Sequence, residues 1–280
     1  MRNFQVELKT QYPVKGGVLK CYLTDRPSVR KVSEWKRPAV IIVPGGSYRA
    51  VCQLEAEPIA LEFLSRGFHA FVLNYVVAGE QGEPYPEQLL ELGSAIDYVK
   101  QNAEEFYVNR QEIFILGFSA GGHLTANLCV EYSSIQRRMG KEMDCKPTAV
   151  GLCYPVISKK NGHQRSFDNL LYGYSETEKE ELLKTLNLNE AVTKDTPPAF
   201  IWTKTLDPIV PSDNALRYAQ ALYNNGVLYE LHVYPYPGHG GSALNSELHP
   251  SGIAPPQNKR MSRWMDDCAE FFRLFIEENF

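Results

Sequence analysis

Short apolar runs alternate with amphipathic stretches over most of the chain, a pattern that predicts β-strands alternating with α-helices. Runs that are apolar almost throughout are typical of strands buried on both faces of a sheet, and they occur at 39–43, 68–77, 112–117, 148–154, 199–203 and 227–234. Helical spacing of apolar residues occurs between and after them, at 58–65, 86–102, 124–131, 212–224 and 258–278. The alternation predicts an α/β fold with a doubly wound, mostly parallel sheet.

The beginning of the chain has a different pattern. Residues 4–10 and 17–24 alternate apolar with polar side chains, as strands with one solvated face do, and 13–17 lies between them. We therefore expect an antiparallel hairpin at the N-terminus.

The predicted helix 86–102 is amphipathic. Its apolar stripe consists of Leu89, Leu90, Leu92, Ile96 and Val99. Glu87, Glu91 and Lys100 lie opposite this stripe, and we expect them to form the polar face.

Residues 157–198 interrupt the alternation with polar and helical sequence. The segment is too short and too poor in apolar residues to form a domain of its own. We expect a single domain over 1–280 with a small helical, cap-like insertion at about 157–198, placed over one end of the sheet.

Composition and charge exclude several classes of function. With a net charge of −4, the chain has no basic footprint for nucleic acid or an acidic membrane surface. It shows neither a secretory apolar core near its beginning nor an apolar run long enough for a membrane span, so the expectation is a cytoplasmic protein. Its 6 cysteines are scattered without Cys-x-x-Cys spacing, which favours buried free thiols over disulfides or a metal site.

Gly117-Phe118-Ser119-Ala120-Gly121 follows one of the buried strand runs and precedes a helical pattern. A serine on a sharp turn from strand to helix needs small neighbours, because a side chain two residues away would collide with the adjoining strand or helix. Gly117 and Gly121 meet that need. The segment therefore predicts a nucleophile elbow with Ser119 at its apex.

A serine hydroxyl needs a base and an orienting carboxylate to act as a nucleophile at neutral pH. His239 follows the last strand run in a glycine-rich loop and is the strongest base candidate, whereas the remaining histidines lie in strand runs, in a helix turn or in polar loops: His69, His123, His163, His232 and His249. Asp207 follows the run 199–203, while Asp213 falls in a helix turn and Asp195 precedes the strand. The order Ser119, Asp207, His239 is that of the α/β-hydrolase arrangement.

This set of residues predicts acyl transfer without metal or cofactor. His239 would take the proton of Ser119 as it attacks an ester carbonyl, and Asp207 would orient the imidazole. The oxyanion would be met by the backbone N–H of Ala120 and by those of Gly46 and Ser47, which follow the strand run 39–43.

The motifs Pro44-Gly45-Gly46-Ser47-Tyr48, Gly117 to Leu124, Thr196 to Phe200, Asp207 to Pro211 and Pro237-Gly238-His239-Gly240 resemble the α/β-hydrolase superfamily, and within it the bacterial esterase/lipase family that includes acetylxylan-esterase-like and sugar-ester hydrolases. The resemblance implies a metal-independent serine esterase that removes short acyl groups, often acetyl. The implied substrate is a small ester, such as an acetylated sugar. Whether the protein forms a homodimer is left open.

The chain departs from this family at two places. Ser47 stands where many relatives have a third glycine, and Thr203-Lys204-Thr205-Leu206 stands where relatives often have a His-Gly pair before the acid. Two other functions compete with an esterase. One is a peptidase of the prolyl-oligopeptidase type, which shares the triad order, and the other is a hydrolase-like binding protein without turnover.

Overall fold

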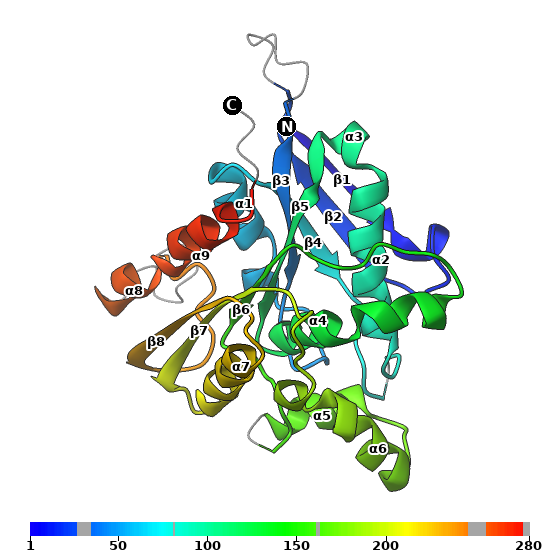
Figure 1. Cartoon of the computed structure of the whole chain (residues 1–280), viewed down its shortest axis with the longest axis vertical. Helices are drawn as coiled ribbons and strands as arrows, with labels where there is room; N and C mark the ends of the chain where they lie inside the picture. Colours follow the sequence, from blue (N-terminus) through cyan, green and yellow to red (C-terminus); the bar gives the residue numbers. More distant parts are fainter. Residues whose placement is uncertain (27–34, 81, 161–162, 246–255, 277–280) are drawn as a thin grey trace.

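The computed structural model describes residues 1–26, 35–80, 82–160, 163–245 and 256–276, and its centre is an eight-stranded sheet with helices on both faces (Figure 1). In spatial order the strands are β1 (Arg2–Glu7), β2 (Val18–Leu23), β4 (His69–Asn74), β3 (Arg37–Val43), β5 (Val108–Phe118), β6 (Val150–Cys153), β7 (Ala199–Leu206) and β8 (Tyr229–Pro237). Pairing is antiparallel from β1 to β2 and from β2 to β4, and parallel elsewhere. The predicted sheet, with its antiparallel N-terminal hairpin, is confirmed.

Each central strand is buried on both faces because alternate side chains enter two separate hydrophobic clusters. In β5, Ile113 and Ile115 belong to one cluster, while Phe114 and Leu116 belong to the other. The first cluster includes residues of α2 (Glu87–Gln101), α4 (Ala120–Met139) and α7 (Asp213–Asn224), and the second includes residues of α1 (Glu57–Ser65) and α9 (Trp264–Arg273). Burial on both sides explains why these strands read as continuous apolar runs.

The register of the parallel strands brings several loops to one edge. Val43 of β3 pairs with Gly117 of β5, and Phe118 pairs with Cys153 of β6. The strands therefore end side by side, and the loops that follow them meet beyond their carboxyl ends, where ligands of such sheets bind.

The segment between β6 and β7 contains α5 (Gln164–Leu170), α6 (Glu176–Leu186) and the 3₁₀ turn η3 (Leu188–Glu190). Figure 1 shows α5 and α6 at the end of the sheet away from the N-terminus. Phe167 and Leu170 are buried in the cluster that also holds α2 and α4. The other short elements are η1 (Leu8–Thr10), η2 (Gln53–Glu55), α3 (Ala103–Phe106) and α8 (Pro256–Met261).

The prediction that Glu87, Glu91 and Lys100 form a polar face of α2 is wrong, because all three side chains are buried. The Glu91 carboxylate accepts a hydrogen bond from the N–H of Val76 at 2.8 Å, and burial raises its pKa to about 8. Lys100 donates to Asp144 and to the carbonyl of Lys146, both at 2.7 Å. Loops from other parts of the chain cover this face, and helical periodicity carries no information about them.

The expected closing helix over 258–278 is also wrong in its extent. The chain forms α8 and then α9, which begins at Trp264 after a turn at Ser262 and Arg263. Trp264, the first residue after the break, stacks on Trp202 of β7, with ring centroids 5.5 Å apart. Residues 277–278 of the expected helix lie outside the described part of the chain.

Candidate active site

Ser119 lies at the junction of β5 and α4 with φ 51° and ψ −114°, a conformation that L-residues rarely adopt. The two flanking glycines permit this turn. A Cβ on Gly117 would lie 2.5 Å from the carbonyl oxygen of Gly121, and one on Gly121 would lie 2.1 Å from that of Val43. The strained backbone places the serine, which is only 6% exposed, at the apex of the turn, as in a nucleophile elbow.

The structure brings the three residues of the predicted triad together. The Oγ of Ser119 is 2.8 Å from the Nε2 of His239, and the Nδ1 of His239 is 2.7 Å from the Oδ2 of Asp207. These residues follow β5, β8 and β7, so three strand ends contribute one each.

The Asp207 carboxylate is held from several directions. Its Oδ1 accepts hydrogen bonds from the N–H groups of Ile209 at 2.8 Å and Val210 at 2.9 Å. Burial raises the pKa of Asp207, but the hydrogen bonds from His239, Val210 and Ile209 outweigh it, so the net pKa lies below its ordinary value. An ionised carboxylate at this position can orient the imidazole and stabilise an imidazolium.

The glycine-rich loop after β3 approaches the serine closely. A Cβ on Gly45 would lie 2.9 Å from the Cβ of Ser119. Gly46 and Ser47 follow with φ of 126° and 55°, and Ala120 is the first residue of α4. Among the described residues, the N–H groups of Gly46 and Ser47, which lie in a loop, donate to no backbone carbonyl. The N–H of Ala120 lies in the first turn of a helix, where N–H groups have no partner within the helix. Their assignment to an oxyanion hole stays a prediction.

The loop after β3 is held by a hydrogen bond to Glu55, a residue that the sequence analysis did not single out. Its Oε2 accepts from the N–H of Gly45 at 2.8 Å, and its Oε1 accepts from the hydroxyl of Tyr154 at 2.7 Å. The ring of Tyr154 in turn meets the imidazole of His239 edge to face, with centroids 5.2 Å apart. Burial raises the pKa of Glu55, although the bonds from Tyr154 and Gly45 oppose the shift.

His163, which the sequence analysis left in a polar loop, also lies near the site. Its Nδ1 is 3.4 Å from the Oγ of Ser47 and 3.1 Å from the Oγ of Ser166. Burial lowers the pKa of His163, and the neighbouring His239 lowers it further. The insertion thus reaches the loop after β3.

The other histidines are held elsewhere. Buried His123 pairs its Nδ1 with the hydroxyl of Tyr48 at 2.7 Å, the N–H of Thr24 donates to the Nδ1 of His69 at 3.3 Å, and His232 contacts Glu230 at 2.6 Å. His249 lies outside the described residues.

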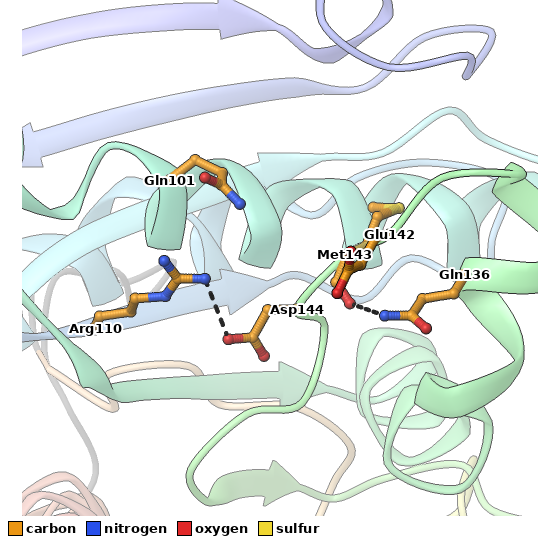
Figure 2. Close-up of a pocket in the computed structure, with 6 residues that line it drawn as sticks. All are labelled: Gln101, Arg110, Gln136, Glu142, Met143 and Asp144. Carbon is orange, nitrogen blue, oxygen red and sulfur yellow. Dashed lines mark hydrogen bonds and ion pairs between the residues drawn. The ribbon is translucent and has the colours of Figure 1, made fainter.

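A cavity of about 490 Å³ adjoins His239 and is also lined by Glu55, Lys204 and Gly241. Figure 2 shows another cavity of about 490 Å³, with a polar lining made by Gln101, Arg110, Gln136, Glu142, Met143 and Asp144. Arg110 lies near the start of β5 whereas Ser119 follows its end, roughly 30 Å away by the rise of a strand. Of these two cavities, the one at His239 therefore adjoins the candidate site.

The described ranges contain no group of three or more His, Cys, Asp or Glu side chains placed to hold a metal ion. No helix among them is both long and apolar enough to cross a membrane.

Comparison with known proteins places this geometry in a family. The sequence profile of the BD-FAE family matches residues 28–222. The chain belongs to the BD-FAE family. Proteins similar to this chain include endo-1,4-beta-xylanase B of Butyrivibrio fibrisolvens, 32% identical over 76% of this chain and 34% of that protein. An acetylxylan esterase of Xylanibacter ruminicola is 30% identical over 79% of this chain and 42% of that protein. This BD-FAE chain thus spans less than half the length of either curated relative.

A solved structure gives an end-to-end match. The acetyl ester-xyloside bifunctional hydrolase from Caldicellulosiruptor lactoaceticus superposes with a TM-score of 0.81 at 30% identity, covering 99% of this chain and 98% of that one. The chain therefore has the α/β-hydrolase fold, as the sequence motifs predicted.

Proposed function

We propose that this protein is a serine carboxylesterase that removes short acyl groups, acetyl in the first place, from carbohydrates or other small alcohols. The observation that carries the proposal is the hydrogen-bonded chain from Ser119 through His239 to Asp207. The acetylxylan esterase and the acetyl ester-xyloside hydrolase among its relatives support the substrate class.

The first half of the reaction forms an acyl-enzyme. His239 accepts the proton of Ser119 while the Oγ attacks the ester carbonyl carbon, and Asp207 stabilises the imidazolium that results. Negative charge develops on the carbonyl oxygen, which the N–H groups of Gly46, Ser47 and Ala120 stabilise. Each such donor typically contributes about 3 kcal/mol to the transition state.

Departure of the alcohol completes the acyl-enzyme, and attack by water then regenerates the enzyme. His239 gives its proton to the leaving alcohol oxygen as the carbon–oxygen bond breaks, and the alcohol departs. A water molecule then gives a proton to His239 and attacks the acyl carbon, which releases the carboxylic acid and returns the proton to Ser119.

The test is hydrolysis of p-nitrophenyl acetate by the wild type, by Ser119→Ala and by Ser65→Ala, which changes an exposed serine on α1. We expect Ser119→Ala to lose roughly 10⁴-fold or more in kcat, as removal of a triad nucleophile does, and Ser65→Ala to match the wild type. Equal rates for all three proteins would refute the assignment.

Labelling distinguishes the competing functions. A fluorophosphonate probe should modify Ser119 of the folded wild type, found by mass spectrometry of the labelled peptide, and a folded protein that stays unlabelled would indicate a binding protein. Cleavage of a prolyl peptide faster than p-nitrophenyl acetate would indicate the peptidase instead.

A further inference from the structure

Lys204 is a buried cation with no hydrogen-bond or ion-pair partner among the described residues. It lies near the end of β7, only 5% of its surface is exposed, and it lines the cavity that adjoins His239. Its Nζ points towards the loop after β8, since a Cβ on Gly241 would lie 3.8 Å from that atom. Among the described residues, no hydrogen-bond acceptor or ion-pair carboxylate contacts this Nζ.

The nearby carboxylates are already engaged. Asp207 accepts from His239, Ile209 and Val210, and its side chain is fully buried. Glu55 also lines the cavity, but its two oxygens accept from Gly45 and Tyr154.

An ammonium group removed from water without an acceptor lowers stability. Burial lowers the pKa of Lys204, although the charge of Asp207 opposes the shift. In the described part of the chain no hydrogen bond or ion pair of this side chain holds another element, so the contacts seen there do not explain a lysine at this position. Its three N–H donors meet no acceptor in the described ranges, and they can bind an anionic group that enters the cavity.

We propose that Lys204 forms a subsite for a carboxylate on the alcohol part of the ester. The inference rests on the proposed function, in which His239 delivers its proton to the leaving alcohol oxygen. The alcohol must then lie at His239, and the adjoining cavity is large enough to hold a sugar-sized group beyond it. The substrates expected to be preferred are short acyl esters of hydroxy acids, including acidic sugars.

The experiment compares two matched esters, monoacetylated D-glucuronate and monoacetylated D-glucose. We expect the wild type to show a kcat/KM roughly 10-fold or more higher for the acidic ester, because hydrogen bonds between charged groups are about twice as strong as neutral ones. Lys204→Met should lower this ratio about 10-fold or more, and Lys204→Arg should retain most of it. Lys194→Met, at an exposed lysine before β7, is the control and should leave the ratio unchanged.

Inhibition gives a second readout that needs no turnover of the acidic ester. D-glucuronate should inhibit p-nitrophenyl acetate hydrolysis by the wild type at lower concentration than D-glucose does, and Lys204→Met should lose this difference. We expect Lys204→Met to melt at the same or a higher temperature, since it removes an unpaired buried charge. If Lys204→Met does not fold, Lys204→Gln takes its place.

The outcomes separate this inference from the proposed function. A wild type that hydrolyses p-nitrophenyl acetate but does not prefer the acidic ester overturns the subsite and leaves the esterase in place. The same conclusion follows if the preference survives in Lys204→Met. A wild type that hydrolyses no ester overturns the proposed function itself.

Discussion

The Oε2 of Glu55 accepts a hydrogen bond of 2.8 Å from the N–H of Gly45, the residue whose backbone packs against Ser119. Through its Oε1 the same carboxylate holds the hydroxyl of Tyr154, and the Tyr154 ring lies against the imidazole of His239. One buried side chain thus contacts residues that support both the proposed nucleophile, Ser119, and the proposed base, His239. Precise positioning of this kind governs catalytic rate more than binding.

Replacing Glu55 should therefore affect kcat more than KM. Glu55→Ala leaves the N–H of Gly45 and the hydroxyl of Tyr154 without acceptors, which costs about 1–3 kcal/mol for each group left unsatisfied. Glu55→Gln keeps one acceptor oxygen and should lose less. Urea unfolding and p-nitrophenyl acetate kinetics measure the two effects. The control is Glu181→Ala on the exposed face of α6, and Glu55→Ala behaving like this control would contradict the proposed support.

Gly117→Ala tests the elbow. The added Cβ would lie 2.3 Å from the Oγ1 of Thr125 and 2.5 Å from the carbonyl oxygen of Gly121, and the second of these atoms belongs to a helix backbone that cannot rotate away. We expect a loss of about 3 kcal/mol in the free energy of unfolding, as for other overpacked sites.

The control for this prediction is Gly140→Ala at the end of α4. Its Cβ would meet nothing within 4 Å, so only the left-handed backbone, with φ of 60°, opposes the substitution. The expected cost is about 1 kcal/mol. Thermal and urea unfolding should show that Gly117→Ala is much less stable than Gly140→Ala. The reverse order would contradict the steric crowding at Gly117.

Buried His123 makes stability depend on pH. Burial lowers its pKa from an ordinary value of 6.5 to about 4, and the pKa of buried His69 falls to about 4 for the same reason. The unfolded chain therefore binds these protons near pH 6.5, whereas the folded chain binds them only near pH 4. Their contribution to stability is complete above pH 6.5 and is lost as the pH falls towards 4, by about 3 kcal/mol for each histidine.

A single variant isolates one of the two groups. His123→Asn has no group that takes up a proton in this range, so its stability should fall less steeply than that of the wild type between pH 6.5 and 4. Urea unfolding at several pH values measures both slopes. Identical slopes would mean that His123 is not held neutral in the folded protein.

Much of the site could be anticipated because parallel strands end at a common edge, so each loop after a strand is a candidate neighbour of the others. This rule selected Ser119, Asp207 and His239, whose side chains the structure joins by hydrogen bonds. The rule did not select Glu55, because this residue lies in a short 3₁₀ turn without a periodic pattern. Its partner Tyr154 is 99 residues away in the sequence. The sequence did mark Lys204, as a charged residue directly after an apolar strand run. That it has no partner among the described residues depends on tertiary packing, which the sequence pattern does not reveal.

Helix α2 illustrates the same limit in the fold. Periodicity identified its apolar stripe, and Leu89, Leu92 and Ile96 are fully buried. The burial of Glu91 depends on the loop that supplies the N–H of Val76, which no helical pattern can reveal. Patterns within one element predict what that element needs to bury. They do not predict which distant loop satisfies a polar group.

The insertion is tied to the loop after β3 by Asn169 of α5, whose Nδ2 donates to the carbonyl oxygen of Ser47 at 2.8 Å. Ser47 has a left-handed backbone with φ of 55°, which costs about 1 kcal/mol or more and must be held by its surroundings. Asn169→Ala removes this hold. We expect it to lower kcat for p-nitrophenyl acetate about 10-fold and to speed amide hydrogen exchange at Ser47 and Tyr48.

The matched control is Asn225→Ala, which removes a similar bond, from a side-chain amide to the carbonyl oxygen of Ala221 at 2.9 Å, at the exposed end of α7. Each variant loses one hydrogen bond, so each should lower the free energy of unfolding by only about 1 kcal/mol. Asn169→Ala alone should lower kcat, because its bond holds a loop that carries the predicted oxyanion donors Gly46 and Ser47. If both variants lose stability alike and neither loses kcat, then α5 covers this loop without positioning it.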